Sequence, residues 1–241
     1  KFDQLLVKLQ SRLNDTRYDF LLRPRKRKTS ESLPGLLRDF VGLGDQNAKV
    51  TVLDLSSVPF DVHPTVTAQI GRLAFEFNYW NPRCREFPIF VVAEEAHSYI
   101  PRATASGHQS TRRSFERIAK AGRKYAVGLC VVSQRPNELS ETVLSQCSTF
   151  ICLRITNPDD QEYVRSLVPD SARGILEAIT SLAPGEAIAT GEGVPMPVRF
   201  RVTMPDPPPN AQDIEYANMW SRGPQDIDVE HIVDCWRRQR R

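Results

Sequence analysis

Short apolar runs alternate along the chain with longer amphipathic stretches. The runs at 89–92, 127–132 and 149–155 are bounded by polar residues, a pattern typical of strands buried in a sheet. Apolar side chains recur at helical spacing in other segments, which predicts helices at 1–15, 33–43, 61–80 and 110–125. Strands that alternate with long helices indicate right-handed crossovers, and hence an α/β fold whose mostly parallel sheet is covered by helices on both faces.

Further elements follow from composition and turn residues. The β-branched segment 49–55 (KVTVLDL) predicts another strand, and 18–22 (YDFLL) predicts a short one. The segments 184–190 and 197–204 are interpreted as an antiparallel hairpin joined by the turn segment GEGVPM. Asn157, followed directly by proline, is expected to cap the start of a helix.

The predicted elements group into three parts. Residues 1–48 are expected to form a helical segment with a basic loop, and residues 49–204 the α/β core. The proline-rich stretch 205–210 predicts a stiff linker, and the pattern at 226–239 predicts a helical tail. The expected architecture is therefore an α/β core that ends in a β-hairpin, followed by a linker and helical tail at 205–241.

Composition is that of an ordinary globular protein. Of the 241 residues, 40% are hydrophobic and 25% are charged. No stretch approaches the ~20 apolar residues that span a bilayer, and no signal peptide is recognised, so a cytoplasmic location without membrane contact is expected. The five cysteines lack zinc-ligand spacing, which favours reduced thiols. The chain begins with lysine rather than methionine, as expected of an excised fragment.

The net charge of +3 is too small to indicate nucleic-acid binding by itself, but the charge is concentrated in two basic runs. Arg25, Lys26, Arg27 and Lys28 belong to the first run, and 237–241 (RRQRR) form the second. The first run is interpreted either as a solvated loop or as DNA contacts, because lysine and arginine hold phosphates without reading sequence. The second is interpreted as a disordered tail or a contact with a neighbouring subunit.

Two adjacent carboxylates, Glu94 and Glu95, follow the first of the three apolar runs, and the second run leads into Ser133 and Gln134. Because parallel strands end at the same edge of a sheet, these polar ends are expected to face one crevice. There an acid polarises an attacking water, and a glutamine bonds that water or a γ-phosphate, as phosphoryl transfer requires. The phosphate-binding loop G-x-x-x-x-G-K-[ST] that such a site needs is absent from this sequence.

The segment between these two strands supplies basic residues that can neutralise phosphate charge, among them Arg117, Arg123 and Lys124. Each assignment has a structural alternative. The two acids are otherwise a solvated strand end, Gln134 a helix cap, and Arg123 a cation that complements a helix C-terminus. His97 is interpreted as a structural histidine, because no second metal ligand lies at usable spacing.

Three segments together closely resemble the HerA branch of the HerA/FtsK ATPases, which are hexameric DNA translocases with a RecA-like (ASCE P-loop NTPase) fold. The segments are VVAEEAHSYIP, RIAKAGRKYAVGLCVVSQRP and LSQCSTFICLRITNPDDQEYV, and they stand in family order. The resemblance covers roughly residues 49–203. It implies that the α/β core is RecA-like.

The resemblance also implies roles for single residues. Glu94 and Glu95 match the Walker B pair, with Glu95 as the catalytic base and Glu94 as a magnesium ligand through water, where many relatives carry aspartate. Gln134 matches the polar sensor. Arg123 matches the arginine finger that acts in trans, and Arg117 is the second candidate for that role. The expected nucleotide contacts are Glu94, Gln134 and Lys124.

The function implied by the resemblance is that of an ATP-driven double-stranded DNA translocase or helicase motor that uses ATP and Mg²⁺. The implied partners are double-stranded DNA, further copies in a homo-hexamer, and a nuclease or other effector such as a NurA-like or Sir2-like protein. In this family the Walker A loop precedes these motifs, so the chain is expected to be the C-terminal part of the ATPase and inactive alone. Two alternatives stay open: a conjugation-type DNA pump of the same superfamily, and a catalytically silent assembly fragment.

Overall fold

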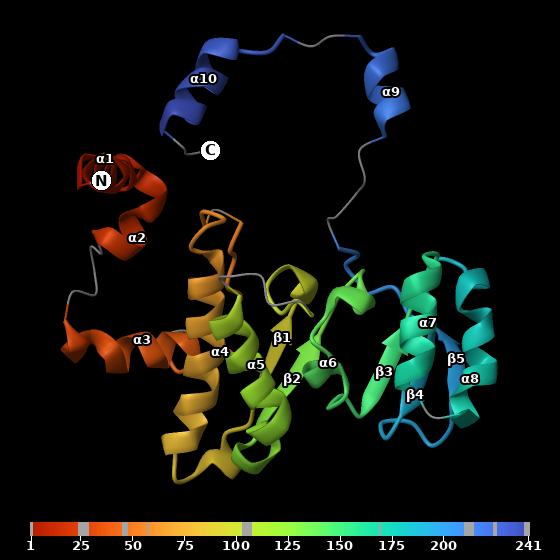
Figure 1. The fold of residues 1–241 in the computed structure, drawn as a ribbon. Coiled ribbons are helices and arrows are strands. Elements are labelled where there is room, and N and C mark those ends of the chain that lie inside the picture. The colour runs from red at the N-terminus through yellow and green to blue at the C-terminus, as the bar shows by residue number, and fades with distance from the viewer. Residues whose placement is uncertain are drawn as a thin grey trace. The chain divides into compact units, whose positions relative to one another are not determined.

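The chain divides into two compact units, one formed by residues 29–202 and the other by residues 1–28 together with 203–241 (Figure 1). No helix among the residues described here is both long and apolar enough to cross a membrane. The computed structural model describes residues 2–23, 29–44, 48–56, 58–102, 108–168, 170–209, 215–223 and 226–238.

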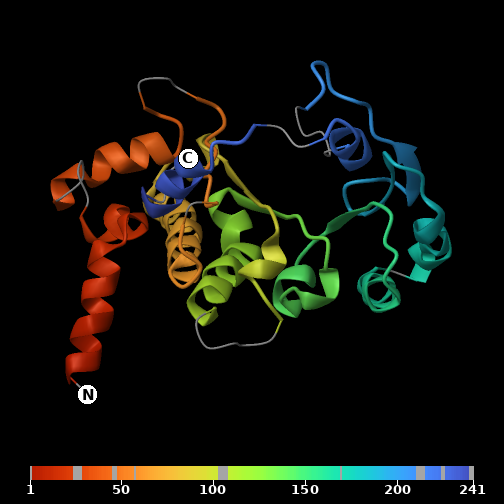
Figure 2. The same cartoon turned by 90° about the horizontal axis from the view of Figure 1, so that it is seen from above.

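A parallel pair of strands forms the first part of the larger unit. β1 (Ile89–Ala93) and β2 (Val127–Val131) pair in parallel over their whole length, as predicted. Helices α4 (His63–Trp80) and α5 (Gln109–Ala121) lie side by side against this pair (Figure 1, Figure 2). The strand–helix–strand unit that the sequence predicts is therefore present.

The face of α5 that packs inward carries Thr111, Phe115 and Ile118, which are buried at helical spacing. Each large apolar side chain that is fully buried stabilises the fold by about 1.5–3 kcal/mol. This face packs into a continuous cluster with α4 and both strands. The buried members of the cluster are Phe75, Ala93, Ala96, Tyr99, Ile100, Phe115, Ile118, Val127, Leu139, Val143 and Leu144.

Asn78 on α4 holds the starts of both strands. It is fully buried, and its side-chain amide donates to the carbonyl oxygens of Phe87 at 2.9 Å and Ala126 at 3.4 Å. These two carbonyls lie just before β1 and β2. A buried carbonyl that loses its donor costs about 1–3 kcal/mol, so the amide specifies where each strand begins relative to the helix.

An antiparallel sheet forms the second part of the unit, in the order β3 (Thr149–Cys152), β4 (Glu186–Gly191) and β5 (Val198–Arg201). The predicted hairpin is confirmed as the β4–β5 pair. β3 pairs antiparallel with β4 instead of extending the parallel sheet. The described strands therefore form one parallel and two antiparallel pairs, which corrects the expectation of a mostly parallel sheet. The physical reason is that β4 occupies the ladder edge of β3, while β2 has no second partner among the described strands.

Helices α7 (Pro158–Leu167) and α8 (Asp170–Leu176) belong to a second apolar cluster with this sheet. The predicted cap of α7 is confirmed, because the side chain of Asn157 accepts from the amide nitrogens of Asp159 and Asp160 at 2.8 and 3.3 Å. Such a cap contributes about 1 kcal/mol.

Further helices confirm the predictions near 1–15, 33–43 and 226–239. The other described helices are α1 (Phe2–Asn14), α2 (Asp19–Leu22), α3 (Leu33–Phe40), α6 (Glu141–Leu144), α9 (Tyr216–Ser221) and α10 (Val229–Arg238). Short 3-10 turns occur at Thr16–Tyr18, Ser30–Ser32, Cys84–Glu86, Ala96–Ser98, Gly122–Tyr125, Pro136–Glu138 and Glu177–Ser181.

Two predicted strands are wrong. The segment 18–22 ends a 3-10 turn and forms α2, because the side chain of Asp15 accepts from the amide nitrogen of Arg17 at 3.0 Å and starts a helical turn. The described part of 49–55 contains no strand, although its composition favours one. Val50 and Val52 are exposed there, since no described strand edge pairs with them and a strand needs a ladder partner.

One face of the parallel pair is left open within the described residues. Phe90 and Val92 alternate with the core-facing residues of β1, and they are 69% and 61% exposed. Phe90 lies against Gly128 of β2, where an added Cβ would come within 2.6 Å of its ring. The expected cover of helices on both faces is therefore found on one face only.

Replacement of Asn78 by alanine is expected to lower the free energy of unfolding by about 1–3 kcal/mol, because the Phe87 carbonyl loses its side-chain donor and the Ala126 carbonyl keeps only the amide of Ile89. Urea unfolding followed by circular dichroism measures this change. Gln69→Ala, at an exposed position of the same helix, is the matched control and is expected to stay within about 0.5 kcal/mol of the unmodified chain. Equal stability of the two variants would contradict the role given to Asn78.

Candidate active site

Backbone pairing between β1 and β2 continues beyond their last residues. The amide nitrogen of Val132 donates to the carbonyl oxygen of Ala93 at 2.9 Å, and the amide nitrogen of Ala96 donates to the carbonyl oxygen of Val132 at 3.0 Å. These bonds hold the segment 94–97 directly beside the segment 132–134. The two polar strand ends that the sequence places at one edge are therefore neighbours.

Glu95 adopts a left-handed backbone conformation, with φ 48° and ψ 40°. This conformation is uncommon for a residue with a Cβ and costs on the order of 1 kcal/mol. It turns the chain sharply after β1, so that the next amide, that of Ala96, bonds the β2 side. The turn is thus fixed by sheet pairing on either side of Glu95.

Both carboxylate oxygens of Glu95 have a fixed neighbour. The Nε2 atom of Gln134 donates to Oε1 at 2.7 Å, and the Nδ1 atom of His97 lies 3.3 Å from Oε2. The same Nδ1 atom lies 3.0 Å from the Oγ atom of Ser133. The Glu95 side chain is still 48% exposed, so water can reach its remaining lone pairs. The structure thus brings Glu95 together with the Ser133–Gln134 strand end, as predicted, and adds His97.

The buried side chain of Tyr99 contacts the turn at Glu94 and Glu95 from the hydrophobic core. Its hydroxyl donates to the backbone carbonyl oxygen of Glu94 at 2.8 Å, and its ring packs on Phe115 with centroids 5.8 Å apart. Burial, and then the negative charges of Glu94 and Glu95, raise the pKa of Tyr99 to about 12. The hydroxyl therefore stays protonated and keeps its bond over the physiological range.

The carboxylate of Glu94 is exposed, next to the turn at Glu95. Within the described ranges it has no hydrogen-bond or ion-pair partner, and no group of three or more His, Cys, Asp or Glu side chains there could hold a metal. Magnesium commonly takes one or two carboxylates together with waters and substrate phosphates. Glu94 thus fits an ion that arrives with a nucleotide, not a cage for a resident metal.

The loops that follow the two strand ends are tied together. Pro101 pairs with Leu139 in an isolated antiparallel bridge. The buried carboxylate of Asp160, on α7, accepts from the amide nitrogen of Asn137 at 3.0 Å. The loop after Gln134 is therefore anchored at two points, which restricts the position of the glutamine.

Arg123 and Lys124 lie at the opposite end of β2 from Gln134. They are exposed in the turn Gly122–Tyr125, just before β2 begins. β2 has five residues, which span about 16 Å at roughly 3.3 Å per residue. Neither cation has a hydrogen-bond or ion-pair partner in the part of the chain that the structure describes. The structure therefore does not bring Arg123 or Lys124 to the Glu95 carboxylate of the same chain.

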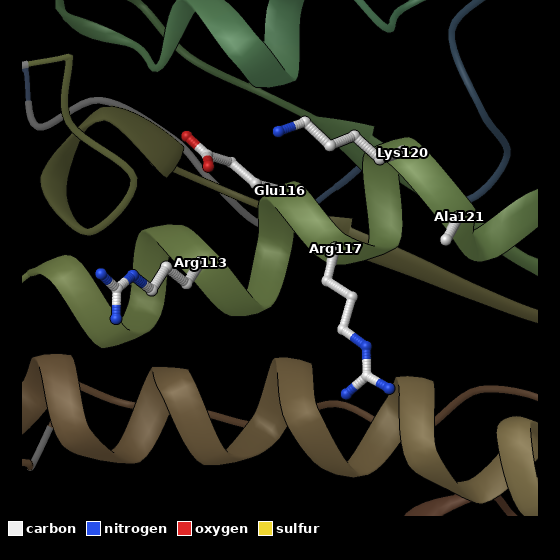
Figure 3. Close-up of a pocket in the computed structure, with 5 residues that line it drawn as sticks. All are labelled: Arg113, Glu116, Arg117, Lys120 and Ala121. Atoms are coloured by element: carbon white, nitrogen blue, oxygen red, sulfur yellow. The ribbon is translucent and has the colours of Figure 1, made fainter.

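Arg117 has partners within its own chain. Its NH1 atom lies 3.5 Å from Oε1 of Glu76, and its guanidinium lies 4.2 Å from the ring centroid of Phe75. Both partners are on α4, toward which the Arg117 side chain points in Figure 3. These contacts give Arg117 a packing role between α5 and α4.

An open hollow of about 270 Å³ lies on the surface of α5 (Figure 3). None of the residues around Glu95 lines it, so it is separate from the candidate site. Its lining residues are Arg113, Glu116, Arg117, Lys120 and Ala121.

The pattern of the sequence does not reveal that His97 and Tyr99 contact the turn at Glu95. His97 stands two residues after Glu95, a spacing that signals proximity in a tight turn. No pattern of apolar and polar positions reveals that the Tyr99 hydroxyl returns to the carbonyl of Glu94, because that bond depends on the left-handed turn. Four predicted DNA contacts lie outside the described residues, namely Arg25, Lys26, Arg27 and Lys28.

A family model described as "Helicase HerA-like C-terminal" matches residues 87–215, which is more than half of the chain. The chain belongs to this HerA-like helicase family. The matched segment contains Glu94, Glu95, Arg123 and Gln134, so the resemblance seen in the sequence is confirmed by the family match.

Similar proteins include archaeal helicases. The DNA double-strand break repair helicase HerA of Pyrococcus furiosus is 36% identical over 156 residues, which are 64% of this chain and 26% of that protein. The helicase of the same name from Sulfolobus acidocaldarius is 31% identical over 192 residues, which are 78% of this chain and 38% of that protein. This HerA-like chain thus spans well under half the length of these relatives.

Among solved structures, the genome packaging NTPase B204 from Sulfolobus turreted icosahedral virus 2, in complex with AMPPCP, gives a TM-score of 0.46 at 10% identity. The superposition covers 59% of this chain and 63% of that chain. At that score the likeness does not decide the fold.

Stability is expected to fall between about pH 10 and pH 12, in part because of Tyr99. An unfolded tyrosine loses its proton near pH 10, whereas Tyr99 in the fold keeps it to about pH 12. In that window the unfolded state binds fewer protons than the folded state, so the free energy of unfolding decreases as the pH rises.

Tyr99→Phe removes this ionisation, so its free energy of unfolding is expected to decrease less than that of the unmodified chain between about pH 9 and about pH 11.5. Urea unfolding at the two pH values measures the difference. Tyr216→Phe, at an exposed position on α9, is the control and is expected to behave as the unmodified chain does. If the free energy of unfolding of Tyr99→Phe depends on pH as that of the control does, Tyr99 is not the cause of the loss of stability at high pH.

Proposed function

We propose that the chain is the part from Walker B onward of an ATP-driven, HerA-type translocase or helicase that acts on double-stranded DNA. The observation that carries the proposal is the Glu95 carboxylate, held by Gln134 and His97 at the paired ends of β1 and β2. Membership of the HerA-like family supports it, since the relatives are named as DNA double-strand break repair helicases. The RecA-like motor core is placed in residues 49–204, and residues 205–241 are its linker and tail.

Glu95 acts as the general base in this proposal. An ionised carboxylate that is held on both oxygens keeps a fixed direction for its remaining lone pairs, and these orient a water and accept its proton. Gln134 has a second N–H and a carbonyl oxygen left over from its bond to Glu95. Those groups are free to bond the water or the γ-phosphate, which suits a sensor of the nucleotide state.

ATP and Mg²⁺ are the proposed cofactors. Glu94 is the proposed magnesium ligand, through water, and the ion when bound neutralises charge on the phosphates. The 241 residues contain no phosphate-binding loop, so the chain alone is expected to hydrolyse little ATP. The exposed Phe90 and Val92, and the edge of β2 that pairs with no described strand, are suitable positions for further parts of the motor to pack.

Arg123 is proposed to complete the site of a neighbouring subunit in a homo-hexamer. It lies about a strand's length from its own Glu95, and it is exposed without a described partner. A guanidinium supplied in trans stabilises charge that develops on the transferring phosphoryl group. Lys124 is proposed to meet the same phosphates. Arg117, the second candidate, is less suited because it is already engaged with α4.

Partner proteins of the NurA-like or Sir2-like kind are proposed from the family resemblance alone. The open apolar face of β1 also favours a second candidate function, a silent assembly fragment that binds another protein through Phe90 and Val92. The two functions differ in one measurable property: ATP turnover by the full-length protein depends on Glu95 only if Glu95 is the general base.

Glu95→Gln in the full-length protein is expected to reduce DNA-stimulated ATP turnover on the order of 10²-fold or more, because the base is lost. Binding of ATP and DNA is expected to remain, since glutamine keeps the shape of the side chain. Steady-state ATPase assays with double-stranded DNA and filter-binding assays measure these quantities. Glu138→Gln, at an exposed glutamate on the following loop, is the control. Unchanged turnover of Glu95→Gln would exclude Glu95 as the base and leave the assembly-fragment function.

Arg123→Ala is expected to nearly abolish hydrolysis while nucleotide affinity stays within a few fold, because the finger acts on the transition state. Arg117→Ala is the comparison, and it is expected to lower thermal stability more than ATP turnover.

Mixing Arg123→Ala with Glu95→Gln protein is expected to restore part of the ATPase activity, since some interfaces then pair an intact base with an intact arginine. The assay is steady-state ATPase after subunit exchange, and mixed rings without recovered activity would refute the trans role.

A further inference from the structure

The His97 side chain lies between the two strand ends that carry Glu95 and Ser133. It projects from the turn Ala96–Ser98 and is 18% exposed. Its Nδ1 atom lies 3.0 Å from Oγ of Ser133 and 3.3 Å from Oε2 of Glu95. One ring nitrogen therefore faces both the acid that follows β1 and the hydroxyl that follows β2.

These neighbours determine which ring nitrogen carries the hydrogen. An ionised carboxylate only accepts hydrogen bonds, so a bare Nδ1 lone pair 3.3 Å from Oε2 of Glu95 would be repelled. Nδ1 is therefore assigned the hydrogen, which it donates to Oγ of Ser133 while the N–H dipole stays close to the Glu95 carboxylate. The hydroxyl oxygen of Ser133 also accepts from the amide nitrogen of Arg135 at 3.0 Å, and this bond fixes the serine on its own loop.

Glu95 is thereby held at two oxygens by two different elements. With the Gln134 bond alone, the carboxylate can rotate about that single anchor and swing its free lone pairs away from the water. With the Nδ1 atom of His97 3.3 Å from the other oxygen, that rotation of the carboxylate is restricted. A misplacement of about 1 Å in a reacting group costs on the order of 100-fold in rate, so this second anchor has catalytic consequences.

We propose that His97 is a positioning residue for the general base, one that orients Glu95 and couples it to the strand end that carries Ser133 and Gln134. The proposal rests on the proposed function of Glu95. His97 itself does not touch the reacting atoms. Because Ser133 and Gln134 are adjacent in sequence, a displacement of the sensor glutamine on loss of the γ-phosphate also displaces the serine and, through His97, the base.

The test compares two amides of different reach at position 97 of the full-length protein. The amide of His97→Asn presents an N–H close to the original Nδ1 position, whereas the amide of His97→Gln reaches toward the Nε2 position. His97→Gln and His97→Ala are expected to lower kcat for ATP on the order of 10- to 100-fold with KM within about twofold. His97→Asn is expected to recover most of kcat. His231→Ala, at an exposed position on α10, is the control and is expected to leave kcat unchanged.

A double variant separates this inference from the proposed function. In a Glu95→Gln background, His97→Ala is expected to lower turnover no further, because a residue that acts only through Glu95 has nothing left to position. A further loss in that background would overturn the proposal. It would also be overturned by equal kcat values for the Asn and Gln variants, or by an unchanged kcat for His97→Gln while Glu95→Gln is inactive. Full activity of Glu95→Gln would instead overturn the proposed function, and this inference with it.

Discussion

The parallel register of β1 and β2 is the constraint on which the candidate site depends. Ala93 lies opposite Val131, and two further backbone bonds carry the pairing past the last residue of each strand. This register, together with the left-handed turn at Glu95, brings a carboxylate from one loop within 2.7 Å of an amide from another, 39 residues later. A slip of one residue would move Glu95 about 3.3 Å along the strand and turn its side chain to the other face of the sheet.

Buried polar groups specify the register of β1 and β2, because apolar packing alone would allow the strands to shift slightly. Apolar contacts stabilise the layer of α4 and α5 on the strands without direction, and they tolerate small shifts. The amide of Asn78 and the hydroxyl of Tyr99 are directional, because each has a defined carbonyl acceptor at one end of the strand pair. Asn78 sets where the strands begin and Tyr99 sets the turn at which β1 ends. The reactive end of the sheet is thus positioned from within the core.

Two arginines six residues apart have different surroundings, although they are chemically identical. Arg117 lies on the helix face that meets α4, where an acid and an aromatic ring hold its guanidinium. Arg123 lies beyond the end of the same helix, in a turn that faces solvent. Arg117 must give up its contacts with α4 before it can meet a phosphate. Arg123 has no partner among the described residues, so it would give up only water. This difference favours Arg123 over Arg117 for the proposed contact with a phosphate.

Local patterns in the amino-acid sequence are sufficient to predict one part of the molecule. Apolar spacing and capping chemistry predict the strands at 89–92 and 127–132, the helices that cover them and the cap at Asn157. The proximity of Glu95 and Gln134 follows from the rule that parallel strands end at the same edge of a sheet. Only the tertiary structure decided that 49–55 forms no described strand and that β3 pairs antiparallel with β4, because ladder partners are chosen by edges far away in the chain. The contact of His97 with Glu95 and its hydrogen bond with Ser133 likewise depend on the three-dimensional structure. These contacts of His97 require both the left-handed turn at Glu95 and the register of β1 and β2. Neither feature can be predicted from the spacing of apolar residues.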